Sequence, residues 1–176
     1  MSSTAHAYVV EPLNKAHDKS AFACGVEALD RYFKQQAGQD ERRHVAVVRV
    51  LRHCESGKVA GFSTLANSMV HLSDLPPAHA QKLPRYPQVP ATLLGRLAVD
   101  LGHRKQGLGE LLLLDAMKRT LESSRVTASF ALLVDAKDEA AKAFYLRYDF
   151  EPIVGLGNRL FLPIQEIERI FAEASQ

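Results

Sequence analysis

The stretch 92–121, TLLGRLAV-DLGH-RKQGLG-ELLLLDAMKRTL, contains the pattern that decides the fold. Its first eight residues are apolar at nearly every position except Arg96, as expected of a buried β-strand. Residues 108–121 include four leucines in a row, which predicts a helix buried on most of its circumference. The residues between them therefore connect a buried strand to a buried helix.

That connection contains two glycines two positions apart, Gly107 and Gly109. Glycine lets a backbone approach a ligand closely, and the first turn of a helix has unpaired N–H groups. Together with the positive end of the helix dipole, these donors predict an anion site. No Gly-Lys-Ser/Thr follows, which excludes a Walker loop, and Leu112 occupies the place of a third glycine in the dinucleotide fingerprint. Taken alone, the pattern also fits a plain tight turn.

Two signatures together resemble the GNAT superfamily of N-acetyltransferases. Arg104-x-x-Gly107-x-Gly109 after an apolar strand resembles its acetyl-CoA motif, and the run Ala141-Lys142-Ala143-Phe144-Tyr145 with Phe150 resembles its Ala-x-x-Phe-Tyr…Gly-Phe signature. The resemblance covers about Thr92 to Phe150. It implies an α/β GNAT fold, with a mixed central sheet flanked by helices, and acetyl-CoA as co-substrate. The cofactor-binding residues it implies are Leu97, Ala98, Val99, Arg104, Lys105, Gln106, Gly107, Leu108, Gly109, Asp138 and Phe144.

The second signature departs from the family at two positions. Asp138 stands where many members have Asn, so its carboxylate can accept from the pantetheine amide but cannot donate to it. Asp149 replaces the glycine before Phe150. Because Asp tolerates a left-handed backbone better than most residues, the turn is expected to survive.

A closer resemblance, over nearly the whole chain, is to the GNAT toxins of type II toxin–antitoxin modules. It rests on CGVEALDRYF at 24–33, LGRLAVD at 94–100 and LLVDAKD at 132–138. It implies a toxin that acetylates the α-amino group of aminoacyl-tRNA and so blocks translation. It further implies a ribbon-helix-helix antitoxin as partner and a homodimer.

Tyr145 is the candidate catalytic residue, because the resemblance places at this position a phenol that protonates the departing CoA thiolate. The alternative interpretation is that Tyr145 is an aromatic residue of the core.

The acceptor is inferred from the strand 92–99, which contains Arg96 and no carboxylate. A lysine acceptor, with a pKa near ~10.4, would need a base, whereas an α-amine at about 7.7–8.0 needs none. The chemistry therefore favours an α-amine.

Two basic stretches are candidates for phosphate contact. Residues 42–53 hold four arginines and no acid, and residues 79–105 hold five Lys and Arg against the single acid Asp100. A tRNA-tracking surface is one interpretation, and solvated charge on a helix and a hairpin is the other. The predicted substrate-binding residues are Arg96, Arg42, Arg43, Arg49, Arg52, Lys82 and Arg85.

The remaining pattern is that of one α/β domain over residues 1–176. Strands are expected at 8–11, 45–51, 59–70, 129–134, 150–154 and 159–162. Val26, Leu29, Phe33 and Ala37 recur at helical spacing, and further helices are expected at 139–147 and 164–174. The five prolines between His71 and Pro90 predict a functional loop rather than a central strand.

Composition sets wide bounds on function. The chain has 176 residues, 47% hydrophobic and 24% charged, with a net charge of +2. Two cysteines, no signal peptide and no long apolar run predict a cytoplasmic protein with reduced thiols. No spacing of His, Cys and acids suggests a metal site. Two rival functions stay open: an acetyltransferase for a small amine or a protein N-terminus, and a non-catalytic acetyl-CoA-binding module.

Overall fold

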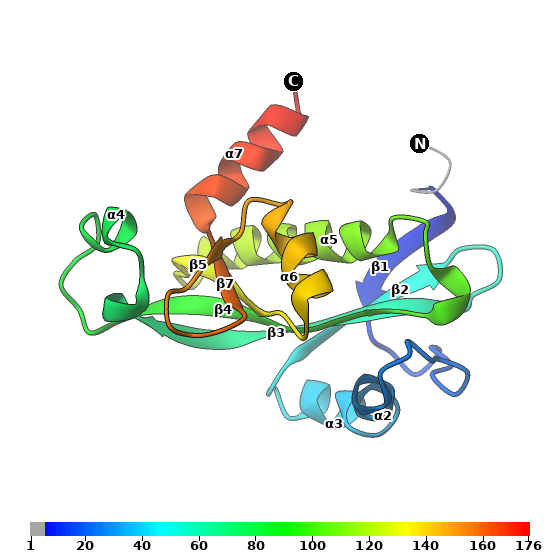
Figure 1. Ribbon diagram of the computed structural model, residues 1–176. Helices are drawn as coiled ribbons and strands as arrows, with labels where there is room; N and C mark the ends of the chain where they lie inside the picture. The colour runs from blue at the N-terminus through cyan, green and yellow to red at the C-terminus, as the bar shows by residue number, and fades with distance from the viewer. Residues whose placement is uncertain (1–5) are drawn as a thin grey trace. The chain divides into compact units, whose positions relative to one another are not determined.

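The computed structural model describes residues 6–176, which fall into two compact units (Figure 1). The first comprises the chain up to Ala66 together with Gly95–Ala116, and the second comprises Asn67–Leu94 and Met117–Gln176. Strands β3 (Val59–His71) and β4 (Gln88–Val99) and helix α5 (Leu108–Ser124) contribute residues to both. Among residues 6–176, no helix has the length and apolar character that crossing a membrane requires.

The strands form a mixed seven-stranded sheet in the order β1-β2-β3-β4-β5-β7-β6. Strands β1 (Tyr8–Pro12), β2 (Val47–His53) and β3 pair antiparallel, and β4 pairs parallel to β5 (Ala131–Asp135). Strand β7 (Arg159–Pro163) pairs antiparallel to β5 and to the short β6 (Glu151–Pro152). The predicted fold class, a mixed sheet flanked by helices, is therefore confirmed.

In the first unit, helices α2 (Glu27–Gln35) and α3 (Ala37–Arg42) cover one face of β1–β3, and α5 covers the other (Figure 1). Side chains alternate along a strand, so Val48 and Val50 pack with Phe33 on the α2 side, whereas Leu51 packs with Leu112 on the α5 side. The predicted helical stripe is correct: Phe33 and Ala37 are fully buried, and Val26 and Leu29 pack against them.

Gly61 lies in β3 where the backbone of β4 comes close. A Cβ atom at Gly61 would lie 2.8 Å from the Ala98 carbonyl oxygen and 3.0 Å from the Leu112 side chain. The glycine is therefore required by this close approach, and it does not end the strand.

The second unit holds the remaining helices, α4 (Pro77–Ala80), α6 (Glu139–Leu146) and α7 (Ile164–Ala174). Its core contains Val89, Leu133, Ile153 and Phe161. The bounds predicted for the last helix agree with the structure, whereas β6 is shorter than the predicted strand 150–154.

The prediction that the proline-rich segment holds no strand is wrong at its end, because β4 begins at Gln88 and includes Pro90. Pro90 lacks an N–H but its carbonyl oxygen still accepts from the Phe130 N–H at 2.7 Å, so the pairing survives. Earlier in the segment, Pro76 and Pro77 begin α4, where a missing N–H is tolerated.

A buried ion pair joins two layers of the first unit. The Arg49 Nε and Nη2 atoms donate to the two Asp115 carboxylate oxygens at 3.0 and 2.9 Å, and Nη2 also donates to the Val10 carbonyl oxygen at 3.3 Å. Arg49 is only 6% exposed. The pair therefore holds β1 and β2 against α5, the helix whose first turn follows the glycine loop.

We predict that Arg49→Ala lowers the free energy of unfolding by about 3 kcal/mol, because it leaves the Asp115 carboxylate buried without the guanidinium. Urea denaturation measures the change. The matched control is Arg52→Ala: Arg52 pairs with Glu11 at 2.6 Å, but its side chain is 30% exposed, so the expected loss is much smaller. Equal losses for the two variants would contradict the assignment of a buried pair.

Candidate active site

The glycine loop at 104–109 has the backbone that an anion site requires. Lys105 and Gly107 both adopt left-handed conformations, with φ of 63° and 73°, and α5 begins at Leu108. A Cβ at Gly107 would meet no atom within 4 Å, so the space beside this backbone is open. A left-handed lysine is strained, and such strain is concentrated at functional sites. The 17-residue α5 follows directly, and the N–H groups of its first turn have no partners within the helix.

The end of β4 offers a second element of the same site. Within residues 6–176 the β4–β5 ladder comprises the pairs Thr92–Leu132, Leu93–Leu133 and Leu94–Val134. Strand β4 continues to Val99, so the backbone of Leu97, Ala98 and Val99 is not used in that ladder. The Ala98 carbonyl oxygen lies beside Gly61 of β3, whereas the backbone groups of Leu97 and Val99, which alternate with it along the strand, are suited to pair with an extended, amide-bearing ligand such as a pantetheine arm.

Asp100 connects the loop to the segment before α2, a role that sequence reasoning missed. Its carboxylate accepts from the Ala23 N–H at 3.0 Å, the Gly102 N–H at 2.9 Å and the His103 imidazole at 3.2 Å. Burial opposes ionisation, but these hydrogen bonds outweigh it and hold the pKa of Asp100 below its usual range. An acid directly after a strand and two residues before a glycine was the available signal.

Arg104 is held by the same segment. Its Nη2 donates to the Cys24 carbonyl oxygen at 2.8 Å, and Gly25 (φ 90°) leaves room for the guanidinium, because a Cβ there would lie 3.2 Å from Nη2. The side chain thus anchors the loop, and its backbone and its charge remain for a ligand. Gln106 is anchored to β1, since its Oε1 accepts from the Tyr8 hydroxyl at 3.3 Å.

In the second unit, Tyr145 is 7% exposed and lies on α6 among aromatic rings. Its ring contacts Phe144 and Phe150 edge-on, with centroids 5.2 and 5.4 Å apart. Burial raises the pKa of Tyr145 to about 12. The phenol is therefore fully protonated near neutral pH and can act as a proton donor.

The two departures from the family signature have different structural roles. Asp149 has φ of 68°, which confirms that the turn before Phe150 keeps a left-handed residue without glycine. Asp138 is the N-cap of α6, where its Oδ1 accepts from the Ala141 N–H at 2.7 Å. One Asp138 oxygen is thus committed to the helix, and the other can accept from a ligand amide.

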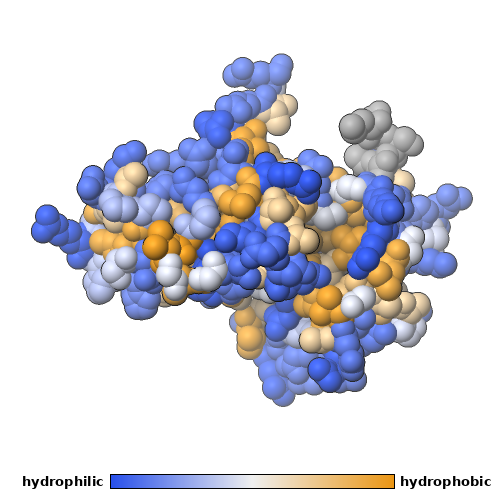
Figure 2. Space-filling model, in the orientation of Figure 1, coloured by the Kyte–Doolittle hydropathy of each residue, from blue (hydrophilic) through white to orange (hydrophobic). Residues whose placement is uncertain are grey.

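The four arginines predicted at 42–53 differ in exposure and pairing. Arg42 and Arg43 at the end of α3 are exposed, and the surface over α2 and α3 is mostly hydrophilic (Figure 2). Arg49 is a correction: it is buried against Asp115 and presents no charge to a polyanion. Arg52 is half-buried and paired with Glu11, whose pKa falls to about 2 through hydrogen bonds from Arg52 and His17.

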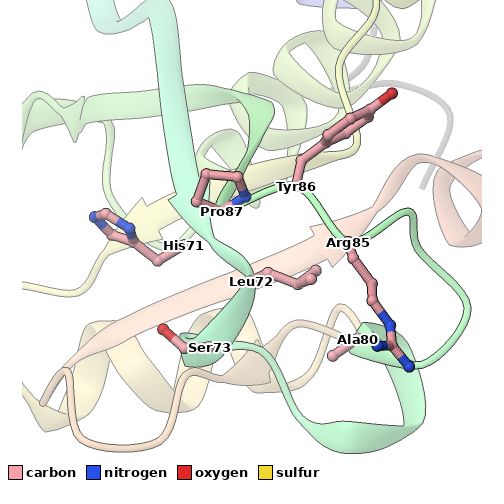
Figure 3. A pocket seen from close by; sticks show the side chains of 7 residues that line it. All are labelled: His71, Leu72, Ser73, Ala80, Arg85, Tyr86 and Pro87. Carbon is pink, nitrogen blue, oxygen red and sulfur yellow. The ribbon is translucent and has the colours of Figure 1, made fainter.

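Lys82 and Arg85 are exposed in the β3–β4 connection of the second unit. Arg85 lines an open pocket of about 660 Å³ together with His71, Leu72 and Tyr86. Figure 3 shows the Arg85 side chain extending toward Ala80, while the Tyr86 ring points the other way. Tyr86 is 64% exposed, so this connection offers both a cation and a free aromatic face.

A family model described as "Acetyltransferase (GNAT) domain" matches residues 41–152. The chain belongs to the GNAT family of acetyltransferases. This family uses acetyl-CoA as acetyl donor, and the open loop, the unused β4 backbone and the start of α5 fit its pyrophosphate and pantetheine. Within residues 6–176, no group of three or more His, Cys, Asp or Glu side chains is placed to hold a metal ion.

Several relatives are similar over most of the chain. A "tRNA-acetylating toxin" of Mycobacterium tuberculosis is 34% identical over 139 residues, which cover 79% of this chain and 81% of the relative. A "Probable toxin TacT" of Sinorhizobium fredii is 27% identical over 170 residues, covering 92% and 94%.

Solved structures agree with these relatives. A tyrosine-to-phenylalanine mutant of KacT has a TM-score of 0.88 at 31% identity, covering 93% of this chain and 99% of that one. A structure described as AtaT complexed with acetyl-methionyl-tRNAfMet has a TM-score of 0.87 at 31% identity, with the same coverage. The GNAT fold thus extends over nearly the whole chain.

We predict that Gly109→Glu abolishes acetyl-CoA binding while the protein stays folded, because a carboxylate in the first turn of α5 repels the pyrophosphate and fills its place. Calorimetric titration with acetyl-CoA measures the affinity. Gly38→Glu, the same change within the short helix α3, is the control and should bind normally. Unchanged affinity in a folded Gly109→Glu variant would falsify the assignment of the loop.

We predict that Tyr145→Phe reduces kcat by about 10²–10⁴-fold, with acetyl-CoA affinity unchanged, because it removes only the proton donor. Tyr148→Phe, the same change three residues later, should keep near wild-type turnover. The acid acts in its protonated form, which is lost only as the pH rises through a pKa of about 12. The pH–rate profile should therefore show no decline up to pH ~9. A Tyr145→Phe enzyme with normal kcat would make Tyr145 a core residue.

Proposed function

We propose that this protein acetylates the α-amino group of the amino acid carried on tRNA and thereby blocks translation. The observation that carries the proposal is the likeness, over 93% of the chain, to AtaT as solved with acetyl-methionyl-tRNAfMet. The relative named as a tRNA-acetylating toxin supports it independently. We also propose that residues 1–176 act as one GNAT catalytic domain in the cytoplasm.

The acceptor chemistry supports an α-amine. Strand β4 has no carboxylate between Gln88 and Val99, and the acid near Arg96 is Asp40 on α3. Hydrogen bonds from Gln36 and Tyr32 lower the pKa of Asp40, which makes it a weak base. A lysine ammonium would keep its proton beside such a group, whereas an esterified α-amine is largely neutral at the pH of the cell.

We assign roles to the residues of each unit separately, from the family resemblance. In the first unit, the loop 104–109 and the β4 backbone bind the acetyl donor, and Arg96 contacts oxygen atoms of the acceptor. For the second unit, the resemblance implies that Asp138 accepts from a pantetheine amide, that Phe144 is a cofactor-binding residue and that the Tyr145 hydroxyl protonates the departing thiolate. Arg42, Arg43, Lys82 and Arg85 contact tRNA phosphates.

We further propose a ribbon-helix-helix antitoxin as partner and a homodimer as the assembly. The support for a protein partner is the likeness to an AtaT mutant toxin solved with the C-terminus of the antitoxin AtaR, at a TM-score of 0.79 and 28% identity. Co-purification with the product of an adjacent small gene, and the mass of the free protein in solution, test the two statements separately.

We predict that label from acetyl-CoA is transferred to charged tRNA only, and is released with the amino acid when mild base hydrolyses the ester. Phosphate contacts should make kcat/KM fall steeply with added salt. Reversing Arg42 and Arg43 to Glu should raise the KM for charged tRNA without changing acetyl-CoA affinity. Reversing the exposed Lys15 and Lys118 is the control for net charge.

Three outcomes would overturn the proposal. Labelling of lysine-rich protein at the same rate as tRNA would favour a protein acetyltransferase. Transfer to small amines alone would favour a metabolic one. Binding of acetyl-CoA with no transfer to any acceptor would favour a non-catalytic module.

A further inference from the structure

Arg96 lies flat on an aromatic ring. On β4 it shares a face with Ala98, which belongs to the core beneath α2, and its Cζ atom is 3.5 Å from the centroid of the Tyr32 ring. The side chain is half-buried. Within residues 6–176 the structure shows no hydrogen bond or ion pair to its guanidinium. Stacking on the ring covers one face of the guanidinium and leaves its N–H edges free.

Tyr32 is itself held in place from two directions. Its hydroxyl donates to Asp40 Oδ2 at 2.8 Å, and the other Asp40 oxygen accepts from Gln36 Nε2 at 2.8 Å. The ring is 8% exposed and stacks on Phe62, with centroids 6.2 Å apart and planes at 21°. Burial and the bond to Asp40 raise the pKa of Tyr32 to about 12, so the phenol keeps its proton.

Within residues 6–176, Asp40 makes no ion pair with Arg96. The carboxylate is close enough for its charge to act on Arg96, and its two oxygens accept from Tyr32 on α2 and from Gln36 at the C-cap of α2. Arg96 is thus immobilised by stacking without using any of its five donors. A planar fork of this kind matches the oxygens of a phosphate in a bidentate geometry, which the ammonium of lysine cannot reproduce.

We propose that Tyr32, fixed by Asp40, is a positioning residue that presents Arg96 as the binding group for one phosphodiester of the tRNA acceptor end. The inference rests on the proposed function and adds to it a defined phosphate contact on the α2 side of β4. This contact would explain why Arg96 lies on β4, the strand whose backbone we propose to bind the acetyl donor. Tyr32 acts through Arg96 and does not touch the substrate.

The test is steady-state kinetics with charged tRNA at saturating acetyl-CoA. Arg96→Lys and Arg96→Gln should raise the KM about tenfold or more and change kcat little, because a charge-assisted bidentate contact is lost. In Arg96→Gln the slope of log kcat/KM against log salt should shrink by about 0.7, the value for one single-strand phosphate, whereas Arg96→Lys keeps the charge and should keep the slope. A residue with only a structural role would leave that slope unchanged.

A double-mutant cycle separates positioning from packing. Tyr32→Leu removes the stack and should raise the KM in the native background, but add nothing in the Arg96→Gln background. Tyr32→Phe keeps the ring, loses the bond to Asp40 and should cost less than about threefold. Acetyl-CoA affinity by calorimetry shows that each variant is folded; if Tyr32→Leu is not, Arg96→Gln and Tyr32→Phe still decide the matter.

The possible results are distinguishable. A wild-type protein that does not acetylate charged tRNA refutes the proposed function, whatever the variants do. A wild-type protein that does, with Arg96→Gln unchanged in KM and in salt slope, refutes the phosphate contact. Additive effects of Tyr32→Leu and Arg96→Gln refute the positioning role and leave Tyr32 as a core residue.

Discussion

The carboxylate of Asp100 makes the contacts on which the first unit's site depends. It follows the last residue of β4 and accepts three hydrogen bonds, one of them from Ala23, which is 77 residues away in the chain. A second hydrogen bond joins the same segments, in which the Leu101 N–H donates to the Ala23 carbonyl oxygen at 2.8 Å. The start of the glycine loop is therefore tied at both its side chain and its backbone to the segment that leads into α2.

These hydrogen bonds connect the glycine loop to α2, the helix whose Tyr32 supports Arg96. In the segment 23–25, the Cys24 carbonyl oxygen accepts from the Arg104 guanidinium of the loop. The Cys24 N–H donates to Asp30 Oδ1, in the first turn of α2, at 2.8 Å. Tyr32 lies on helix α2, and its ring stacks against the Arg96 guanidinium. A short series of contacts thus connects the loop to the Arg96 guanidinium. Rigid support of this kind is what a transferase needs to hold two substrates at reacting distance.

The parts of the site that sequence could predict are those determined by local chemistry. A left-handed backbone at Asp149 and at Gly107 follows from the residue types, and the stripe ending at Phe33 and Ala37 follows from helical spacing. Arg49 could not be predicted in this way, because its partner Asp115 is 66 residues away. The alternation Val48-Arg49-Val50 shows that Arg49 faces away from its neighbours, but not that α5 covers that face. The position of Pro90 within β4 could not be predicted for a similar reason, because its carbonyl oxygen accepts from the N–H of Phe130, which is distant in the sequence.

The arginines show most clearly what three-dimensional structure adds to a count of charges. In sequence, Arg42, Arg49, Arg52 and Arg96 are equivalent cations. In the structure, Arg49 and Arg52 are bound to carboxylates, and each would have to give up an ion pair before it could bind a phosphate. Arg96 is held by a neutral ring instead. Its stack on the ring uses none of its N–H donors, so binding a phosphate there would break no ion pair. Stacking on an aromatic ring is the arrangement that lets a half-buried cation stay both ordered and available.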